Sequence, residues 1–148
     1  MTVSSHGKRL RMQTIEVPGS SPRIVLFGVR KQAECQRALD SLSHELSTFH
    51  RSYPQEWTID VMCTDITWNE LCQIADQKKT STAFTVLSKK QTFVRGDIFN
   101  HTRSAYRQTI AHELGHILCK CSSEEIADSF ADDIQGYKAG AGDRKVRN

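Results

Sequence analysis

The sequence predicts an α+β fold in which a small mixed sheet precedes two antiparallel helices. Between residues 23 and 100, short segments rich in β-branched and aromatic residues alternate with segments whose apolar residues recur at helical spacing. From residue 101 to residue 137 the spacing is helical, with one short polar interruption near residue 121. The first region is therefore expected to form the sheet, and the second a helical hairpin packed against it.

Six elements are expected in the sheet region, in the order β-α-β-α-β-β. By their apolar patterns they fall at residues 23–29, 31–53, 57–63, 68–75, 82–87 and 92–98. Thr67 is the expected cap of the second helix, and the polar residues 88–91 predict a hairpin between the last two strands. We expect the strand at residues 92–98 to lie at the edge of the sheet.

The helix expected at residues 104–120 carries the pentapeptide His112-Glu113-Leu114-Gly115-His116. Two histidines four residues apart lie on one face of a helix, so both imidazoles can reach a single metal ion. Glu113 is then placed to take a proton from a water molecule that the metal activates. The motif predicts one catalytic zinc ion and a hydrolytic reaction.

The residues around the motif agree with this interpretation. The apolar stripe of the helix lies on the other side from the histidines, and consists of Ile110, Leu114, Ile117 and Leu118. A glycine inside a helix costs about 1 kcal/mol relative to alanine. Gly115 is explained if another segment must approach the helix closely beside the metal.

A second helix is expected directly after a short turn. Ser122 and Glu125 have the spacing of a capping box, which marks a helix start. Because the turn is short, the two helices should be antiparallel. Glu124 would then lie opposite His116, within reach of the metal, and Asp128 would lie one turn further along, where it can hydrogen-bond a ligand histidine.

The two helices together resemble the gluzincins, which are zinc peptidases with a glutamate as third ligand. The resemblance covers about residues 105–134 and rests on HELGH followed by Glu-x-x-x-Asp. Residues 124–131 also resemble a segment of the ImmA/IrrE-type peptidases, and the chain is similar in size to the minigluzincins. The resemblance implies a zincin-like fold, Glu124 as the third zinc ligand and Asp128 as the residue that orients a ligand histidine.

Several alternatives for the zinc ligands remain open on spacing alone. Glu125, Asp128 and Asp132 are the other carboxylates that can reach the metal from the second helix. Cys119 and Cys121 are further candidates, although we expect them to be small buried thiols. A third histidine of the metzincin type is excluded, because Ser122 occupies that position.

The resemblance also implies a reaction, the hydrolysis of a peptide bond with Glu113 as general base. Such enzymes need a group that stabilises the oxyanion. Tyr137 is the expected residue, with His101 and Tyr106 as alternatives. An extended peptide is expected to pair with the edge strand. Little chain follows the second helix to build a deep cleft, which favours a specific protein substrate.

Length and composition fit this function. The 148 residues are expected to form a single catalytic domain. It has a flexible lead-in or a loosely held first strand at 1–22, a sheet region at 23–100, metal-site helices at 101–137 and a mobile basic tail at 138–148. A net charge of +3 (20 basic against 17 acidic residues) demands no nucleic-acid partner. No signal peptide or membrane span is visible, so we expect a cytoplasmic protein with five reduced cysteines.

Two other functions compete with the peptidase hypothesis. The first is a zinc-binding regulatory or interaction module without catalysis, against which Glu113 argues, because a structural zinc site needs no general base. The second is a regulatory component that binds nucleic acid weakly through Lys89, Lys90 and the tail. The oligomeric state is not predicted.

Overall fold

The computed structural model describes residues 22–28, 32–78 and 80–136, together with three short strands nearer the N-terminus. Most of the expected lead-in therefore lies outside the described residues. The same is true of Tyr137, the expected oxyanion residue, and of the expected basic tail at 138–148.

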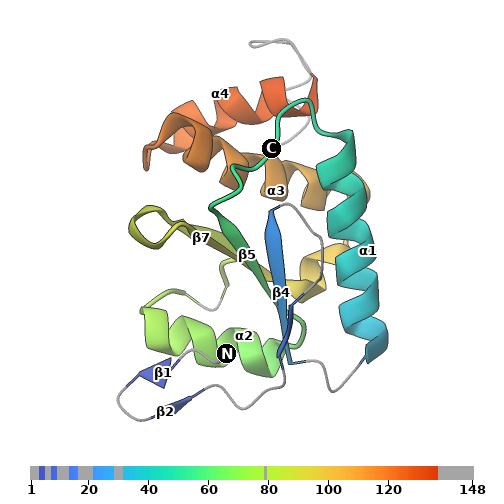
Figure 1. Ribbon diagram of the computed structural model, residues 1–148, viewed down its shortest axis with the longest axis vertical. Coiled ribbons are helices and arrows are strands. Elements are labelled where there is room, and N and C mark those ends of the chain that lie inside the picture. Colours follow the sequence, from blue (N-terminus) through green and yellow to red (C-terminus); the bar gives the residue numbers. More distant parts are fainter. Residues whose placement is uncertain are drawn as a thin grey trace.

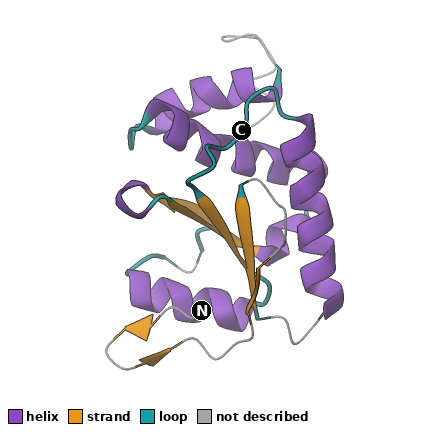
Figure 2. Ribbon diagram, in the orientation of Figure 1, coloured by secondary structure: helices purple, strands orange, loops and turns teal. Residues whose placement is uncertain are grey.

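The chain has an α+β fold with a five-stranded mixed sheet, which confirms the predicted class (Figures 1 and 2). In spatial order its strands are β3 (Thr14–Glu16), β4 (Arg23–Phe27), β5 (Thr58–Met62), β7 (Gln91–Arg95) and β6 (Ala83–Val86). The three central strands are parallel, and the two outer strands pair antiparallel with their neighbours. A separate ribbon joins β1 (Ser4–Ser5) to β2 (Lys8–Arg9).

Helices cover both faces of the sheet. They are α1 (Gln32–Thr48), α2 (Asp65–Ala75), α3 (Arg103–Cys119) and α4 (Glu124–Gln135), with short 3-10 turns η1 (Leu87–Lys89) and η2 (Gly96–Asn100). Alternate strand residues point to opposite faces. Ile59 and Val61 thus join the cluster formed with α1, α3 and α4, whereas Met62 joins the cluster formed with α2. None of the described helices has the length and apolarity needed to cross a membrane.

Two predicted element boundaries are wrong for identifiable reasons. The first helix ends at Thr48 and not near residue 53, because the backbone N–H of His50 donates to the carbonyl of Ile134 in α4 and leaves the helical ladder. The helix predicted from residue 68 begins at Asp65, because Thr64 is its cap. Thr67 stands at the third helical position, where it completes a reciprocal capping box with Thr64.

The predicted edge strand is also wrong. Residues 92–98 do not form one strand: β7 ends at Arg95 and the chain continues into η2. In addition, β7 is an inner strand, since it pairs in parallel with β5 and antiparallel with β6. The hairpin between the last two strands is confirmed, but its first strand, β6, is the one at the edge.

Reduced cysteines were expected, yet four of the five cysteines form disulfides. Cys35 in α1 is bonded to Cys63 at the end of β5, and Cys119 is bonded to Cys121. Cys72 is free and buried. Cys35, Cys63 and Cys72 lie in the core, and the packing of α1 on the sheet brings the first pair close enough to bond.

A buried ion cluster holds the N-terminal half of α3 against α1. The carboxylate of Glu45 is fully buried and accepts hydrogen bonds from Arg103 and Arg107. Burial on its own would raise the pKa of Glu45, but the two guanidinium groups outweigh it and hold that pKa below its usual value. Because removal of one partner from such a cluster leaves a buried charge uncompensated, the cluster fixes the position of α3 firmly.

Candidate metal centre

The motif lies in the middle of α3, which is well defined at both ends. Thr102 caps its start by accepting a hydrogen bond from the backbone of Ala105, and Lys120 closes its end in the left-handed conformation. Of the predicted apolar stripe, Ile110, Leu114 and Ile117 are buried in the core and Leu118 is half-buried against it. Glu113 and His116 are buried too, because α4 and the edge strand cover the other side of the helix.

α4 crosses α3 closely at Gly115, as the sequence predicts. A Cβ atom at this glycine would lie 2.3 Å from the carbonyl oxygen of Ala127, which is far inside van der Waals contact. The predicted start of α4 is one residue too early, since Ser123 and not Ser122 accepts the capping hydrogen bond from Ile126. Glu124 is consequently the first residue of α4 and faces the histidines.

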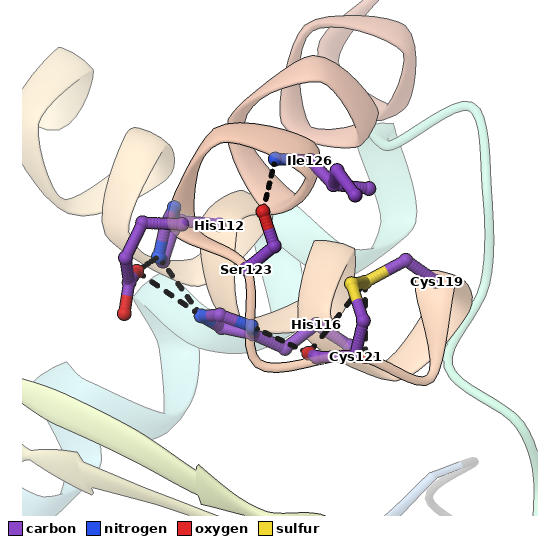
Figure 3. Close-up of a disulfide and its surroundings, with 7 residues drawn as sticks. His112, His116, Cys119, Cys121, Ser123 and Ile126 are labelled. Atoms are coloured by element: carbon purple, nitrogen blue, oxygen red, sulfur yellow. Dashed lines mark hydrogen bonds and ion pairs between the residues drawn. A yellow bond between two sulfur atoms is a disulfide. The ribbon is translucent and has the colours of Figure 1, made fainter.

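Three side-chain atoms converge at one point between the two helices. Nε2 of His112 lies 3.1 Å from Nε2 of His116, and Oε1 of Glu124 lies 2.6 Å and 3.3 Å from these two nitrogens. Ligand atoms around a tetrahedral zinc ion are roughly 3.3 Å apart. The two separations that involve His116 match this spacing, whereas the one between His112 and Glu124 is shorter. Figure 3 shows the two imidazoles side by side near the turn between the helices.

Nδ1 of each imidazole contacts an oxygen that can accept a hydrogen bond but has no proton to donate. Nδ1 of His112 donates to the carboxylate of Asp128 at 2.7 Å, as predicted, and Nδ1 of His116 donates to the backbone carbonyl of Cys121 at 2.9 Å. Each neutral ring must therefore carry its proton on Nδ1 and present a lone pair at Nε2. Two such lone pairs at 3.1 Å repel each other unless a cation lies between them.

This arrangement can hold a metal ion. His112, His116 and Glu124 offer ligand atoms that all lie within 4.8 Å of one another, and the part of the chain that the structure describes contains no second cluster of this kind. Two imidazoles and one carboxylate match the ligands of catalytic zinc sites. The side chain of Glu124 is 76% exposed, so the centre is open to solvent on that side.

The other ligand candidates occupy different places. Asp128 accepts a hydrogen bond from Nδ1 of His112, and Asp132 is buried and lies outside the cluster. Glu125 is exposed and outside the cluster. The sulfur atoms of Cys119 and Cys121 are bonded to each other, so they are not thiolates that could bind a metal.

Glu113 lies next to the cluster without belonging to it. Only 6% of the residue is exposed, and Oε1 accepts a hydrogen bond of 2.7 Å from the hydroxyl of Thr85 in β6. Burial raises the pKa of Glu113, although the Thr85 hydrogen bond and the charges of the two histidines oppose this effect. A carboxylate with a raised pKa beside a solvent-open cluster that could hold a metal ion is suited to accept and return a proton.

A cleft of about 490 Å³ leads to these residues. One wall is formed by Gln77, by residues 80–82 and by the edge strand β6, and the other is the turn at Cys121 and Ser122. His101 and Tyr106 do not line it: His101 is exposed just before α3, and the ring of Tyr106 packs against Phe99. Among the described residues, neither alternative for oxyanion stabilisation is therefore brought to the centre.

The chain was compared with known protein families, curated proteins and solved structures. The chain matches no protein family model, no curated protein and no solved structure. The resemblance to the gluzincins consequently rests on the residues of α3 and α4 alone.

Proposed function

We propose that this protein is a zinc-dependent metallopeptidase with a zincin-like arrangement, in which a mixed sheet packs on the metal helix. The observation that carries the proposal is the separation of two roles. His112, His116 and Glu124 converge on one point, while Glu113 stands beside them with its own hydrogen bond and without a metal-binding position. A purely structural zinc site has no need of such a carboxylate.

In this proposal His112, His116 and Glu124 hold the zinc ion, and other residues keep them in place. Asp128 and the Cys121 carbonyl keep both rings in the tautomer with a free Nε2. When bound, zinc supplies a Lewis acid that lowers the pKa of water and polarises a carbonyl. Glu113 accepts a proton from the attacking water and passes it to the leaving amide nitrogen.

The substrate proposed is an extended segment of a specific protein. β6 is the outermost strand of the sheet on the side of the metal centre, and it forms one wall of the cleft. A peptide can pair with this edge and so align a scissile bond across the cleft. The cytoplasmic location stays a prediction from the sequence, while the two disulfides are more typical of an oxidising compartment.

The experiment compares zinc-loaded wild type with Glu113→Gln in cleavage of a fluorescence-quenched peptide library, with zinc measured in both. We expect one zinc per chain in each protein, cleavage by the wild type, and a loss of at least about 100-fold in the variant. Equal zinc with no cleavage by either protein would favour the non-catalytic zinc-binding module. Cleavage that survives Glu113→Gln would contradict the role of this residue.

A further inference from the structure

Glu113 is held from outside its own helix, by a side chain that the motif does not contain. The hydroxyl of Thr85 lies 2.7 Å from Oε1 of Glu113, although 28 residues separate them in the chain. Thr85 belongs to β6 and points to the face of the sheet that α3 covers, whereas its neighbour Phe84 belongs to the cluster on the opposite face. Only the packing of the sheet on α3 brings this hydroxyl to the carboxylate.

The direction of the hydrogen bonds follows from the number of protons. A hydroxyl has one proton to donate, and an ionised carboxylate only accepts. Thr85 therefore donates to Glu113 and must accept from Thr92, whose hydroxyl lies 3.0 Å away. Thr92 is fully buried and is the cross-strand partner of Thr85 in the β6–β7 register. The two threonines, here called the hydroxyl pair, thus form a chain that ends on Oε1.

The neighbouring Tyr53 does not compete for the hydrogen bond between Thr85 and Glu113. The buried hydroxyl of Tyr53 lies near Thr92 and Glu113, without a well-formed hydrogen bond to any of the described residues. Burial, and then the negative charge of Glu113, raise the pKa of Tyr53, while Thr92 lowers it. The tyrosine therefore fills the space near Thr92 and Glu113 as a neutral group. Oε1 is fixed by the hydroxyl of Thr85.

We propose that Thr85, supported by Thr92, is a positioning residue that fixes the carboxylate of Glu113 for proton transfer. This inference rests on the proposed peptidase function, and it adds that catalysis requires the Thr85 hydroxyl to hold the Glu113 carboxylate. Because Thr85 belongs to the edge strand with which a peptide would pair, the position of the substrate and that of the base depend on the same strand. A base displaced by about 1 Å can lose roughly 100-fold in rate.

The test uses the zinc-loaded full chain and two substitutions at the same position. Thr85→Val keeps the shape of the side chain and removes the hydroxyl, whereas Thr85→Ser keeps the hydroxyl and removes a methyl group. The substrate is the library peptide that the wild type cleaves fastest. We expect Thr85→Val to lose about 10- to 100-fold in kcat with KM and zinc content unchanged. Thr85→Ser should stay within a few-fold of wild type, and Thr92→Val should fall between them.

Three results would overturn the inference: wild-type kcat in Thr85→Val, an equal loss in Thr85→Ser, or a loss explained by missing zinc. Crystal structures of wild type, Thr85→Val and Thr85→Ser make the test independent of substrate. The Glu113 carboxylate should occupy one orientation in wild type and Thr85→Ser, and turn away in Thr85→Val. If the wild type cleaves no peptide, the peptidase proposal fails, and these structures alone decide whether Thr85 fixes Glu113.

Discussion

The proton on each histidine of the metal centre is placed by the acceptor behind it. Asp128 performs this role for His112, and Gln108 in turn donates to Asp128 at 3.4 Å. Burial would lower the pKa of His112, but the hydrogen bond to Asp128, together with the neighbouring carboxylates Glu113 and Glu124, raises it. In the proposed site, a metal ion and a proton would therefore compete for Nε2 of His112.

Asp128→Ala should weaken zinc binding about 10- to 100-fold, because the His112 ring loses the acceptor that sets its tautomer and orientation. Zinc affinity is measured by competition with a chromophoric chelator at pH 7.5. Asp133→Ala is the matched control, since Asp133 lies on the same helix and bonds to Arg51 at the surface. Equal zinc affinities in Asp128→Ala and Asp133→Ala would show that Asp128 has no role in zinc binding.

The site residues that the sequence predicts are those whose relation is local. His112, Glu113 and His116 share a helical turn, and a short turn between helices suffices to place Glu124 and Asp128 opposite them. Thr85 could not be found in this way, because its contact with Glu113 depends on the order of the strands. The acceptor for His116 is a backbone carbonyl, for which side-chain patterns give no signal.

At the scale of elements, the crossing of α3 and α4 builds the centre. Gly115→Ala would normally stabilise a helix by about 1 kcal/mol. Here the new methyl group would overlap the Ala127 carbonyl, and such overpacking costs about 1–3 kcal/mol. We expect α4 to be displaced, with lower stability in urea and at least about 10-fold weaker zinc binding. A variant that is more stable and binds zinc as tightly as wild type would show that the helices do not touch there.

The Cys119–Cys121 disulfide fixes the turn whose carbonyl holds His116 (Figure 3). Its reduction by a phosphine, which yields two thiols and the phosphine oxide, should free the Cys121 carbonyl and weaken zinc binding about 10-fold. The effect should persist in a Cys35→Ser/Cys63→Ser protein and vanish in a Cys119→Ser/Cys121→Ser protein. Unchanged or tighter zinc binding after reduction of wild type would contradict the contact.

Element types were predicted better than the arrangement of the elements. Periodicity gave the helices and strands, since apolar residues at intervals of two or near 3.6 can bury one face only in that conformation. The edge strand was predicted wrongly, because local pattern does not say that β7 inserts between β5 and β6. The disulfide between Cys35 and Cys63 was missed for the same reason: the two residues lie 28 positions apart, and local pattern does not show that they meet.

In the whole molecule, the sheet separates the proposed metal centre from a second core that contains a titratable group. Asp60 in the central strand is 3% exposed and lies on the α2 face, where Gln91 donates to it at 3.3 Å. Burial raises the pKa of Asp60 to about 7, and the charge of Arg23 only partly opposes this. The folded state therefore holds a proton that the unfolded state releases at a lower pH.

This proton makes stability depend on pH. The pKa of Asp60 is higher in the folded chain than in the unfolded chain. The contribution of its protonated carboxyl to the free energy of unfolding is therefore fully present below about pH 4, and it is lost as the pH rises to about 7. Asp60→Asn should remove this loss and stabilise the protein above pH 7, by at most about 4 kcal/mol. Urea unfolding of metal-free protein from pH 5 to pH 8 measures it, with the exposed Asp40→Asn as control. The same pH slope in wild type and Asp60→Asn would contradict the assignment.

The central claim, a metal centre built by α3 and α4, is tested most directly by zinc stoichiometry. Wild type, Glu124→Ala and Glu125→Ala are each stripped with a chelator, reloaded, and analysed for bound zinc. We predict one zinc per chain in wild type and in Glu125→Ala, and loss of most of it in Glu124→Ala, because only Glu124 points to the two histidines. A wild-type chain that cannot be loaded, or a Glu124→Ala chain that keeps its zinc, would contradict the account.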